Sequence, residues 1–369
     1  MYDYLVVGAG LAGSTIAERL ASELGASVLL VDKRPHIGGN CHDPLTPDGL
    51  RYHQYGPHIF HTNSAAVVSY LSQFTEWLPY EHRVLARVGD RLVPIPINRT
   101  TLNRLYDLDL DEAGAERFLA ARAMPAARIQ NSEDMIVARV GRELYELFFR
   151  GYTRKHWGLD PAQLDATVCG RIPTRTNDDD RYFGDSFQAM PAQGFTAMIG
   201  RMTANPRIEI VTGRDYKAVA DRTRFNHLVF TGPIDEFFDF KYGRLPYRSL
   251  RFEFETREQE WVQPVGCINE PSEAVPFTRT TEYKHLTRQT HPKTILSREY
   301  PSAEGDPYYP IPRPDNKALY ERYRQLVARE PNVTFAGRLA EYRYYNMDQV
   351  VASALVTFDE LASVARVAS

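Results

Sequence analysis

The chain has few cysteines and no long apolar run. Cys41, Cys169 and Cys267 are scattered among 369 residues, at spacings that fit neither a disulfide framework nor a metal site. No stretch approaches the ~20 apolar residues that a membrane-spanning helix needs, and no basic-then-apolar leader opens the sequence. We therefore expect a cytoplasmic protein with reduced cysteines, no membrane span and no metal.

An excess of one charge is also missing. The formal net charge is -3 at pH 7, and no run of like charge is long enough to form a basic arm, which argues against nucleic-acid binding. The content of 43% hydrophobic and 25% charged residues is typical of a soluble globular enzyme. Because 369 residues exceed one ordinary core, we expect two or three structural units in one compact body.

The N-terminus has the pattern of a βαβ unit. Tyr4–Val7 is an apolar run typical of a buried parallel strand, Leu11–Leu24 has helical apolar spacing closed by Gly25, and Ser27–Val31 predicts the next strand. Between the first strand and the helix lies Gly8-Ala9-Gly10-Leu11-Ala12-Gly13, a G-x-G-x-x-G motif. This placement favours dinucleotide binding over a chance glycine pattern.

Each glycine of that motif has a physical role. Gly8 permits the tight turn, Gly10 lets a pyrophosphate approach the backbone, and Gly13 lets the helix pack closely on the strand. The free N–H groups at the helix N-terminus favour the anion. Asp32 ends the second strand, where a ribose hydroxyl needs an acceptor.

The segment after Asp32 favours FAD over NAD. Lys33 and Arg34 lead into Gly38-Gly39-Asn40, where two glycines allow the backbone to pass close to the pyrophosphate and ribityl chain. A plain glycine turn is the alternative. A second G-x-G-x-x-G motif, which a tightly bound nicotinamide would require, does not follow any later strand.

The middle of the chain changes character. His82–Val88 and Arg91–Ile97 predict a hairpin that turns at Gly89-Asp90, and Thr100–Trp157 has a helical pattern with a start at Asn131 and breaks at Gly141 and Gly151. Four later segments alternate like the strands of an antiparallel sheet: Ser249–Glu255, Val265–Asn269, Phe277–His285 and Thr294–Glu299.

Elements of the nucleotide-binding type return between and after these segments. We predict a helix at Phe195–Met202, strands at Ile208–Val211, His227–Phe230 and Val333–Ala336, and a final helix with Val350 to Leu361 on its apolar face. The predicted fold is therefore α/β, a Rossmann-type FAD-binding domain with an inserted helical bundle and an antiparallel β-sheet domain. The expected boundaries are 1–78, 185–240 and 315–369 for the FAD-binding domain; 101–164 for the helical domain; and 79–100, 165–184 and 241–314 for the sheet and substrate domain, with a mobile loop near 171–181.

Several polar groups stand out as candidates for chemistry. His58 and His61 lie in an apolar loop, where they are either core residues or site residues. Arg171, Arg175 and Arg279 are either surface arginines or, as a set, a clamp for a diphosphate. Tyrosines beside prolines and charged residues fit a site that stacks a base and hydrogen-bonds a sugar.

With these features the chain resembles the bacterial UDP-galactopyranose mutase family over essentially its whole length. The motifs that support the resemblance are Lys33–Asn40, Gly56–Thr62, Gly151–Gly158, Arg171–Arg175, Pro307–Pro310 and Gly337–Tyr342.

The resemblance implies a redox-neutral isomerase that interconverts UDP-galactopyranose and UDP-galactofuranose for surface polysaccharide synthesis. Its FAD is active when reduced, and flavin N5 acts as the covalent nucleophile, which accounts for the absence of a protein nucleophile triad. The resemblance also implies an external reductant, a homodimer and no nucleic-acid partner.

The same resemblance implies roles for individual residues. Arg171, Arg279 and His58 would be catalytic. The substrate would contact Phe148, Tyr152, Thr153, Trp157, Tyr182, Asn269, Tyr309 and Tyr345. The cofactor would contact Gly8, Gly10, Ala12, Gly13, Asp32, Lys33, Gly38, Gly39, Asn40, His58, Ile59, His61, Asp215, Tyr216, Arg338, Asn346, Met347, Gln349 and Val350.

Some positions depart from the commoner family pattern. His156 stands where many relatives have glutamine, Asn346 replaces a frequent aspartate beside the flavin, Ala336 precedes Gly337, and Cys41-His42 follows Asn40. Asn346 removes a negative charge and therefore bears on the flavin potential. The competing hypotheses are a flavin oxidase of the amine-oxidase type, which would consume its substrate, and a nucleotide-sensing protein without flavin turnover.

Overall fold

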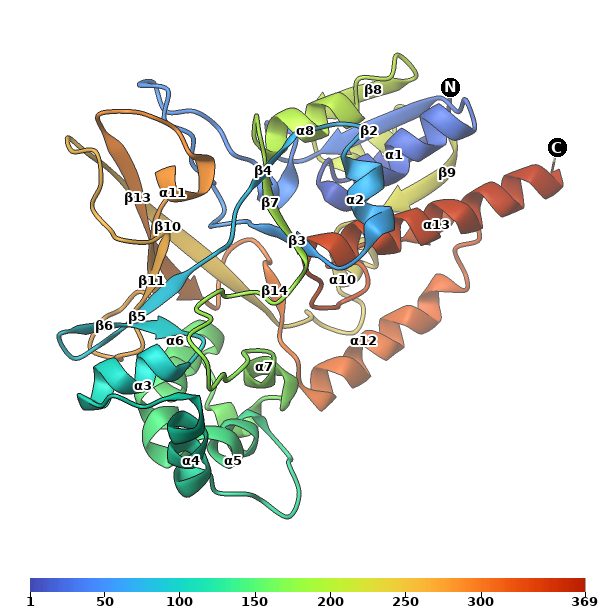
Figure 1. The fold of residues 1–369 in the computed structure, drawn as a ribbon. Helices are drawn as coiled ribbons and strands as arrows, with labels where there is room; N and C mark the ends of the chain where they lie inside the picture. Colours follow the sequence, from blue (N-terminus) through green and yellow to red (C-terminus); the bar gives the residue numbers. More distant parts are fainter. Residues whose placement is uncertain (369) are drawn as a thin grey trace.

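A parallel sheet forms the nucleotide-binding half of the computed structural model, which describes residues 1–368 (Figure 1). Its strands are β1 (Tyr2–Val7), β2 (Val28–Asp32), β8 (Ile208–Thr212), β9 (Phe225–Phe230) and β15 (Val333–Phe335). They lie in the order β15-β9-β1-β2-β8, so the two strands of the N-terminal unit are at the centre. In the register, Val7 is opposite Val31 on one side and Phe230 on the other.

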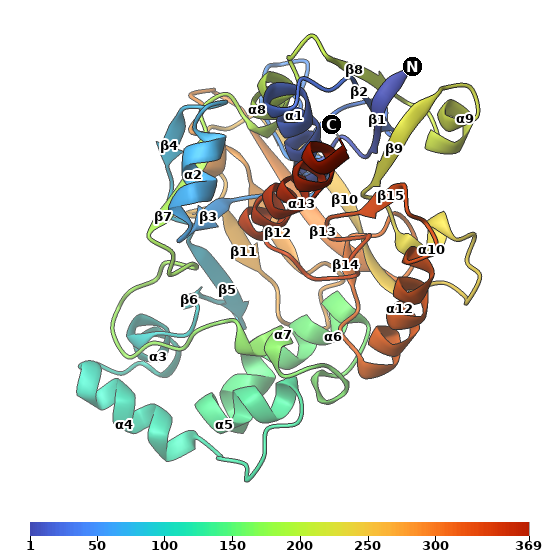
Figure 2. The ribbon, with the colours of Figure 1, turned by 90° about the vertical axis from the view of Figure 1, so that its right-hand side faces the viewer.

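Two helices pack together over this sheet. α1 (Leu11–Glu23) begins directly after the glycine motif, and α13 (Met347–Ala368) lies beside it in both ribbon views (Figures 1 and 2). Ile16 and Leu20 of α1 share a core with Ala354 and Phe358 of α13. The chain leaves α1 at Gly25, whose φ of +62° is left-handed and suits a glycine.

The second large sheet has seven strands. Its members are β5 (Val84–Val88), β6 (Arg91–Ile95), β10 (Tyr247–Arg257), β11 (Cys267–Asn269), β12 (Arg279–Glu282), β13 (Thr294–Ser302) and β14 (Tyr309–Pro310). They lie in the order β14-β10-β13-β12-β11-β5-β6. The predicted antiparallel pairing is confirmed except between β11 and β5, which pair in parallel.

One predicted strand of this sheet is too long. The expected strand Phe277–His285 ends as β12 at Glu282, and α11 (Lys284–Thr287) follows it. The buried ammonium of Lys284 donates to the carbonyls of Glu260, His291 and Lys293. A helical turn aims this side chain inward at three acceptors, which offsets the cost of burying its charge.

The helical segment lies against the β5–β6 end of the sheet (Figure 2). It contains α3 (Arg99–Tyr106), α4 (Glu112–Arg122), α5 (Ser132–Tyr145), a π-helical turn (Glu146–Arg150), α6 (Gly151–Trp157) and α7 (Thr167–Gly170). The Asn131 side chain caps α5 by accepting the N–H of Asp134 at 2.9 Å, as predicted. Gly141 interrupts α5 with a φ of +83°, also as predicted.

The expected break at Gly151 is wrong. The helical backbone continues through this residue, and the carbonyl oxygen of Pro271 would lie 2.4 Å from a Cβ there. A glycine is needed for this close approach of a neighbouring loop, and its helical φ and ψ do not stop the helix.

The remaining elements were not predicted from the sequence, apart from α8. They are α2 (Ala65–Leu71), α8 (Phe195–Met202), α9 (Tyr216–Ala220), α10 (Ile234–Phe237), α12 (Pro314–Val327) and a three-stranded sheet in the order β3 (Phe60–Thr62), β7 (Phe187–Pro191), β4 (Trp77–Pro79). Most of them are too short for a sequence period to show. This small sheet is central to the site, because it joins the loop of His58 to the segment after the arginine loop.

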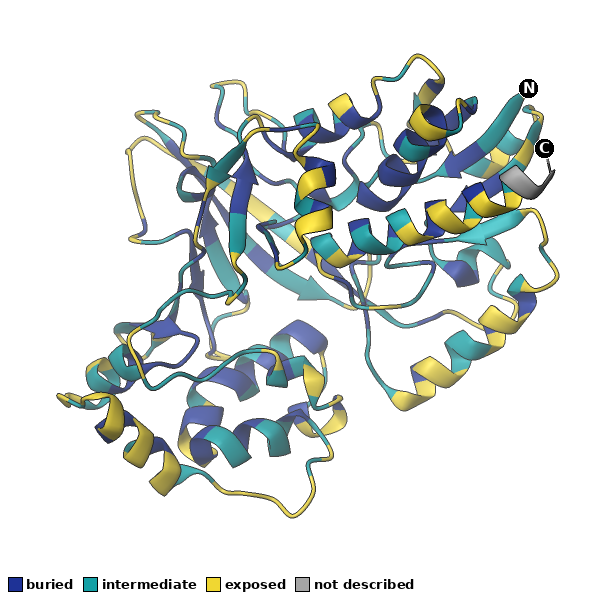
Figure 3. Ribbon diagram, turned by 45° about the vertical axis from the view of Figure 1, so that its right-hand side comes forward, coloured by how far each residue is buried: buried dark blue, intermediate teal, exposed yellow. Residues whose placement is uncertain are grey.

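The predicted α/β class, with a Rossmann-type unit beside helical and mainly antiparallel parts, is confirmed. Figure 3 shows exposed residues on the outer faces of the helices and buried residues toward the sheets. None of the helices in residues 1–368 combines the length and apolar character that a bilayer crossing requires. The expected domain boundaries stay a prediction.

Candidate active site

The glycine motif forms a tight turn against the ends of two strands. Gly8 has a φ of +101°, and a Cβ there would lie 2.1 Å from the hydroxyl of Thr231 after β9. A Cβ on Gly13 would lie 1.9 Å from the carbonyl oxygen of Gly8. Both glycines are therefore required by the packing of the turn, as the motif predicts.

A second glycine pair brings another loop to the N-terminus of α1. A Cβ on Gly39 would lie 2.8 Å from Cα of Gly10, and Gly38 donates its N–H to the carbonyl of Ala9 at 2.8 Å. The two loops pass each other with their backbones in contact, and both line the same cavity, so a ligand in that cavity would meet the N-terminus of α1 with its free N–H groups and positive dipole end.

Asp32 holds this arrangement together. Its carboxylate accepts the N–H of Ala9 at 2.8 Å and the N–H of Arg34 at 2.8 Å. The residue therefore braces the turn from behind while its side chain also lines the cavity. A carboxylate oxygen can accept a further hydrogen bond, so a ribose hydroxyl remains a suitable partner.

A long cavity runs along these loops and encloses about 1260 Å³ including its open mouth. Of the residues predicted to bind a cofactor, those that line it are Gly8, Gly10, Ala12, Asp32, Lys33, Gly38, Gly39, Asn40, His58, Asp215, Tyr216, Arg338, Met347 and Val350. The turn Thr231-Gly232-Pro233 and Asp306-Pro307 also line it and were not selected from the sequence. The position of Thr231 directly after a predicted strand was the signal available for it.

Five predicted cofactor residues lie elsewhere. Gly13 packs behind the turn, and Gln349 caps α13 by accepting the N–H of Asn346 at 2.9 Å. Ile59, His61 and Asn346 line a second, neighbouring cavity.

The second cavity encloses about 2100 Å³ including its mouth, and the helical segment, the seven-stranded sheet and the start of α13 all contribute to it. Every residue predicted to bind substrate lines it: Phe148, Tyr152, Thr153, Trp157, Tyr182, Asn269, Tyr309 and Tyr345. Arg171 and Arg279 line it as well. His58, Arg338 and Met347 line both cavities, so the two are separated by a shared wall.

Arg279 is held by two polar neighbours. Its Nη2 donates to the Tyr152 hydroxyl at 2.6 Å, and its Nε lies 3.4 Å from Glu299 Oε1. Burial acts to lower the pKa of this guanidinium, but Glu299 and Tyr152 outweigh it and hold the pKa above its ordinary value. The arginine therefore stays cationic inside the cavity, as an anion-binding residue must.

Arg171 has an aromatic neighbour. Its guanidinium carbon lies 4.6 Å from the ring centroid of Tyr344, which stacks on Tyr309 at 5.4 Å. Burial acts to raise the pKa of the Tyr344 phenol, but Arg171 and Arg338 outweigh it and the pKa is lowered. The residue predicted from the sequence is the next one, Tyr345, which also lines the cavity but whose hydroxyl donates to Glu341.

Glu299 and His82 also line the second cavity and were not selected from the sequence. Glu299 is buried and accepts the Thr278 hydroxyl at 2.9 Å. His82 is buried, with its Nδ1 held by the Tyr80 hydroxyl at 3.0 Å. Neither residue lies in a motif, and only the pairing of distant strands brings them to the cavity.

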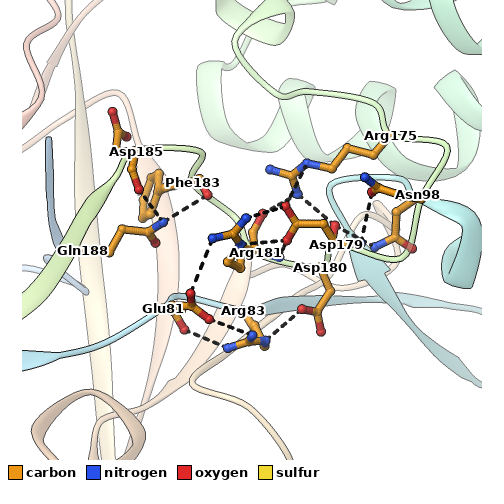
Figure 4. A network of polar contacts seen from close by, with 11 residues as sticks. Glu81, Arg83, Asn98, Arg175, Asp179, Asp180, Arg181, Phe183, Asp185 and Gln188 are labelled. Atoms are coloured by element: carbon orange, nitrogen blue, oxygen red, sulfur yellow. Dashed lines mark hydrogen bonds and ion pairs between the residues drawn. The ribbon is translucent and has the colours of Figure 1, made fainter. Parts of the chain in front are cut away.

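The loop expected to be mobile is anchored along much of its length (Figure 4). Arg181 makes two contacts of 2.9 Å with the Asp179 carboxylate, and Arg83 contacts Asp180 at 2.8 Å. Arg175 donates to the carbonyl of Asp179 at 3.0 Å. Hydrogen bonding to Arg181 lowers the pKa of Asp179 to about 2. Closure of this loop over a ligand stays a prediction. Because the anchoring contacts involve residues 175–181, the prediction concerns mainly the part of the loop that begins at Arg171.

We expect the buried histidines to make the fold sensitive to acid. Burial lowers the pKa of His53 to about 3 and that of His82 to about 3, whereas a histidine in the unfolded chain protonates near pH 6.5. Between these values the unfolded state binds more protons, so the free energy of unfolding falls as the pH decreases below 6.5. At pH 5 each residue is expected to remove about 2 kcal/mol.

Urea unfolding at pH 7 and pH 5 measures this effect. The free energy of unfolding should fall between pH 7 and pH 5 by about 2 kcal/mol less in H53Q than in the parent protein. An unchanged difference would show that His53 is protonated in the folded protein.

Comparisons with known proteins agree with this geometry. A family model described as UDP-galactopyranose mutase matches residues 147–344, and a model described as an NAD(P)-binding Rossmann-like domain matches residues 6–74. The chain is 40% identical to a probable UDP-galactopyranose mutase of Klebsiella pneumoniae, over 98% of this chain and 95% of the relative. It is 34% identical to a dTDP-fucopyranose mutase of Escherichia coli, over 96% of this chain and 97% of the relative.

The fold is also that of a solved protein. A crystal structure of reduced UDP-galactopyranose mutase matches with a TM-score of 0.77, at 17% identity, over 99% of this chain and 94% of that one.

Proposed function

Because this chain belongs to the UDP-galactopyranose mutase family, we propose that it interconverts the pyranose and furanose forms of UDP-galactose with reduced FAD. The membership confirms the sequence-based assignment to the family and to the isomerases. The observation that carries the proposal is the shared wall of the two cavities. A dinucleotide in the first cavity would reach the sugar of a nucleotide sugar in the second across His58, Arg338 and Met347.

The first cavity fits FAD. Gly10 and Gly39, which approach too closely for a Cβ on Gly39, present bare backbone to the cavity where a pyrophosphate would lie, and the N-terminus of α1 supplies N–H donors. Arg338 is fixed on the wall because its Nη2 donates to the carbonyl of Tyr345 at 2.6 Å. The guanidinium would hold the isoalloxazine end, and Asp215 and Tyr216 would lie toward the adenosine end.

The second cavity fits a nucleotide diphosphate sugar. Phe148 and Tyr152 would contact the uracil, and Asn269 would offer it amide hydrogen bonds. Arg171 and Arg279 would hold the diphosphate and balance the charge of UDP as a leaving group. The tyrosines Tyr182, Tyr309 and Tyr344 would surround the phosphates and sugar.

The chemistry at the anomeric carbon would come from the cofactor. When bound in its reduced form, FAD supplies N5 as the nucleophile toward that carbon. His58, which donates Nδ1–H to the carbonyl of Gly56 at 2.8 Å, would position this end of the ring. The residues themselves orient the sugar, neutralise the phosphates and restrict water. Reduction would need an external electron donor, and the buried thiols Cys41, Cys169 and Cys267 suit a reducing compartment.

A redox-neutral mutase converts substrate only after its flavin is reduced and consumes no reductant per turnover. We expect dithionite-reduced protein to convert UDP-galactofuranose into UDP-galactopyranose and the oxidised protein to be inactive. Chromatographic separation of the two sugar nucleotides measures the conversion. The dTDP-linked fucose of the Escherichia coli relative is the informative second substrate: faster turnover of it would reassign the substrate.

The flavin-oxidase alternative predicts different products. An oxidase would release peroxide in proportion to the substrate consumed, in air and without dithionite. Peroxide with an amine substrate, and no sugar conversion by the reduced protein, would contradict the mutase.

A further inference from the structure

Helix α6 and the connection between β11 and β12 meet beside the second cavity. α6 supplies Tyr152 and Trp157 to the lining of this cavity. The two strands supply Asn269 at the end of β11 and Arg279 at the start of β12. Asn269 and Arg279 are register partners, so the connection 270–278 leaves the sheet and returns to it at the cavity. Its position relative to α6 therefore sets the separation of the residues that would hold a nucleotide.

The side chain of Lys155 ties this connection to α6. Its Nζ donates to the carbonyl of Glu270 and to the carbonyls of Ser272 at 2.8 Å, Val275 at 2.9 Å and Phe277 at 2.9 Å. An ammonium has three N–H groups, so four converging carbonyls engage all of its donors and surround it as oxygen ligands surround a bound cation. One side chain thus fixes most of the length of the connection.

Gly151, one helical turn before Lys155, brings α6 into contact with the same connection. A Cβ on Gly151 would lie 2.4 Å from the carbonyl oxygen of Pro271. Residues four apart share one face of a helix, so the close approach and the ammonium act on the same face of α6. Tyr152, which follows Gly151 directly, lines the cavity. The placement of the connection and that of the Tyr152 ring are therefore linked through α6.

The charge of Lys155 is retained, and the other contacts of the connection are weaker. Burial lowers the pKa of Lys155 to about 8, against the opposing effect of the carboxylates of Glu270 and Glu273, so the side chain is mainly protonated at pH 7. Arg87 of β5 contacts only the first residue of the connection, Glu270, at 3.0 Å. Arg154 of α6 lies 3.5 Å from the exposed carboxylate of Glu273, and a surface ion pair of this kind contributes little.

We propose that Lys155 is a positioning residue for nucleotide recognition, which holds the connection 270–278 against α6 so that Asn269 and Tyr152 are spaced for a pyrimidine base. The inference rests on the proposed binding of a nucleotide sugar in the second cavity. Lys155 does not itself line either cavity, so it acts through the residues that do. Without the ammonium, the four carbonyls lose their donor and the connection is free to shift. The free-energy cost of ordering it then falls on ligand binding.

Binding of UDP to the FAD-loaded protein tests this role apart from turnover. K155M keeps the length of the side chain but has no donor, and it should raise the Kd for UDP by about 10- to 100-fold in titration calorimetry at pH 7. The KM for the sugar nucleotide should rise with it, while kcat of the reduced protein changes by less than about threefold, because the residues around the sugar are untouched.

ADP is the second probe, because it shares the ribose and diphosphate of UDP but carries another base. The Kd for ADP should change by less than about threefold in K155M, so that the preference for UDP over ADP decreases. A general loosening of the site would weaken both ligands alike. In K155A, added n-propylammonium, which supplies the missing chain and charge, should restore part of the affinity for UDP.

R154M is the matched control, since Arg154 is the neighbouring cation on α6 and contacts the same connection only through the Glu273 carboxylate. Its Kd for UDP should stay within about twofold of the parent value. The FAD absorbance of each variant reports whether the protein is folded, and K155Q, whose amide keeps two N–H donors, replaces K155M if the latter does not retain FAD.

Parental affinity for UDP in K155M, or an equal loss of affinity for UDP and ADP, would overturn the proposal. A parent protein that does not bind UDP would instead contradict the assignment of the second cavity to a nucleotide sugar.

Discussion

Replacement of Gly13 by alanine is expected to weaken FAD binding by about 100-fold and to lower the activity of the purified protein with it. The new Cβ would lie 1.9 Å from the carbonyl oxygen of Gly8 and 3.1 Å from its carbonyl carbon, which are backbone atoms of the cofactor-binding turn. The turn must shift to relieve this overlap, at a cost of about 3 kcal/mol. If that cost falls on the cofactor-bound form, the affinity for FAD decreases by about 100-fold.

The FAD absorbance of the purified protein measures this loss. G200A is the matched control, because Gly200 is also a helical glycine but its added Cβ would meet only Cδ1 of Ile37, at 3.8 Å. The control should keep its flavin and gain slightly in stability from the higher helix propensity of alanine. A yellow G13A protein with parental FAD content would show that the turn does not bind the pyrophosphate.

Removal of the Arg171 side chain is expected to lower kcat/KM by about 100- to 1000-fold while FAD stays bound. Arg171 lines the second cavity and not the first, and its guanidinium lies over the ring of Tyr344, at 4.6 Å from the centroid. Within residues 1–368 it forms no ion pair with a carboxylate, so its positive charge remains available to a diphosphate. The loss should be largest where UDP departs, since the negative charge on the phosphates increases there.

Kinetics of R171A under reducing conditions, with the FAD content measured on the same sample, check this expectation. R171K should recover only part of the activity, because an ammonium lacks the planar fork of a guanidinium. R142A is a suitable control: Arg142 pairs with Glu133 at 2.5 Å on the exposed side of α5. Equal losses of FAD and activity in R171A would contradict the assignment of this arginine to the substrate.

The local motifs made the nucleotide-binding half predictable. The glycines at 8, 10 and 13 lie in the turn between strand and helix, as the motif predicts, and an added Cβ would overlap neighbouring atoms at Gly8 and at Gly13. The positions of Asp32 and of Gly38-Gly39 followed from the same local logic. In contrast, the extent of β12 was misjudged, because the turn that follows it depends on carbonyls from three distant segments that receive the Lys284 ammonium.

The tyrosine beside Arg171 shows the same limit. Tyr344 and Tyr345 are adjacent in a segment without periodicity and both line the cavity, and the sequence contains nothing that says which ring lies against Arg171. The choice depends on Glu341, which accepts the hydroxyl of Tyr345, and on Tyr309 from β14, which stacks on Tyr344.

By itself the sequence determined the α/β class, the dinucleotide-binding turn and the family, since these rest on residues within a few positions of each other and on motifs along the whole chain. Only the tertiary structure decided that the two cavities share a wall, that Glu299 faces Arg279, and that Asp185 holds His61. The residues that these features bring together are 20 positions apart for Arg279 and Glu299, 124 for His61 and Asp185, and up to 289 for the shared wall of His58, Arg338 and Met347. Such pairings arise from sheet register and packing, to which no local pattern in the sequence corresponds.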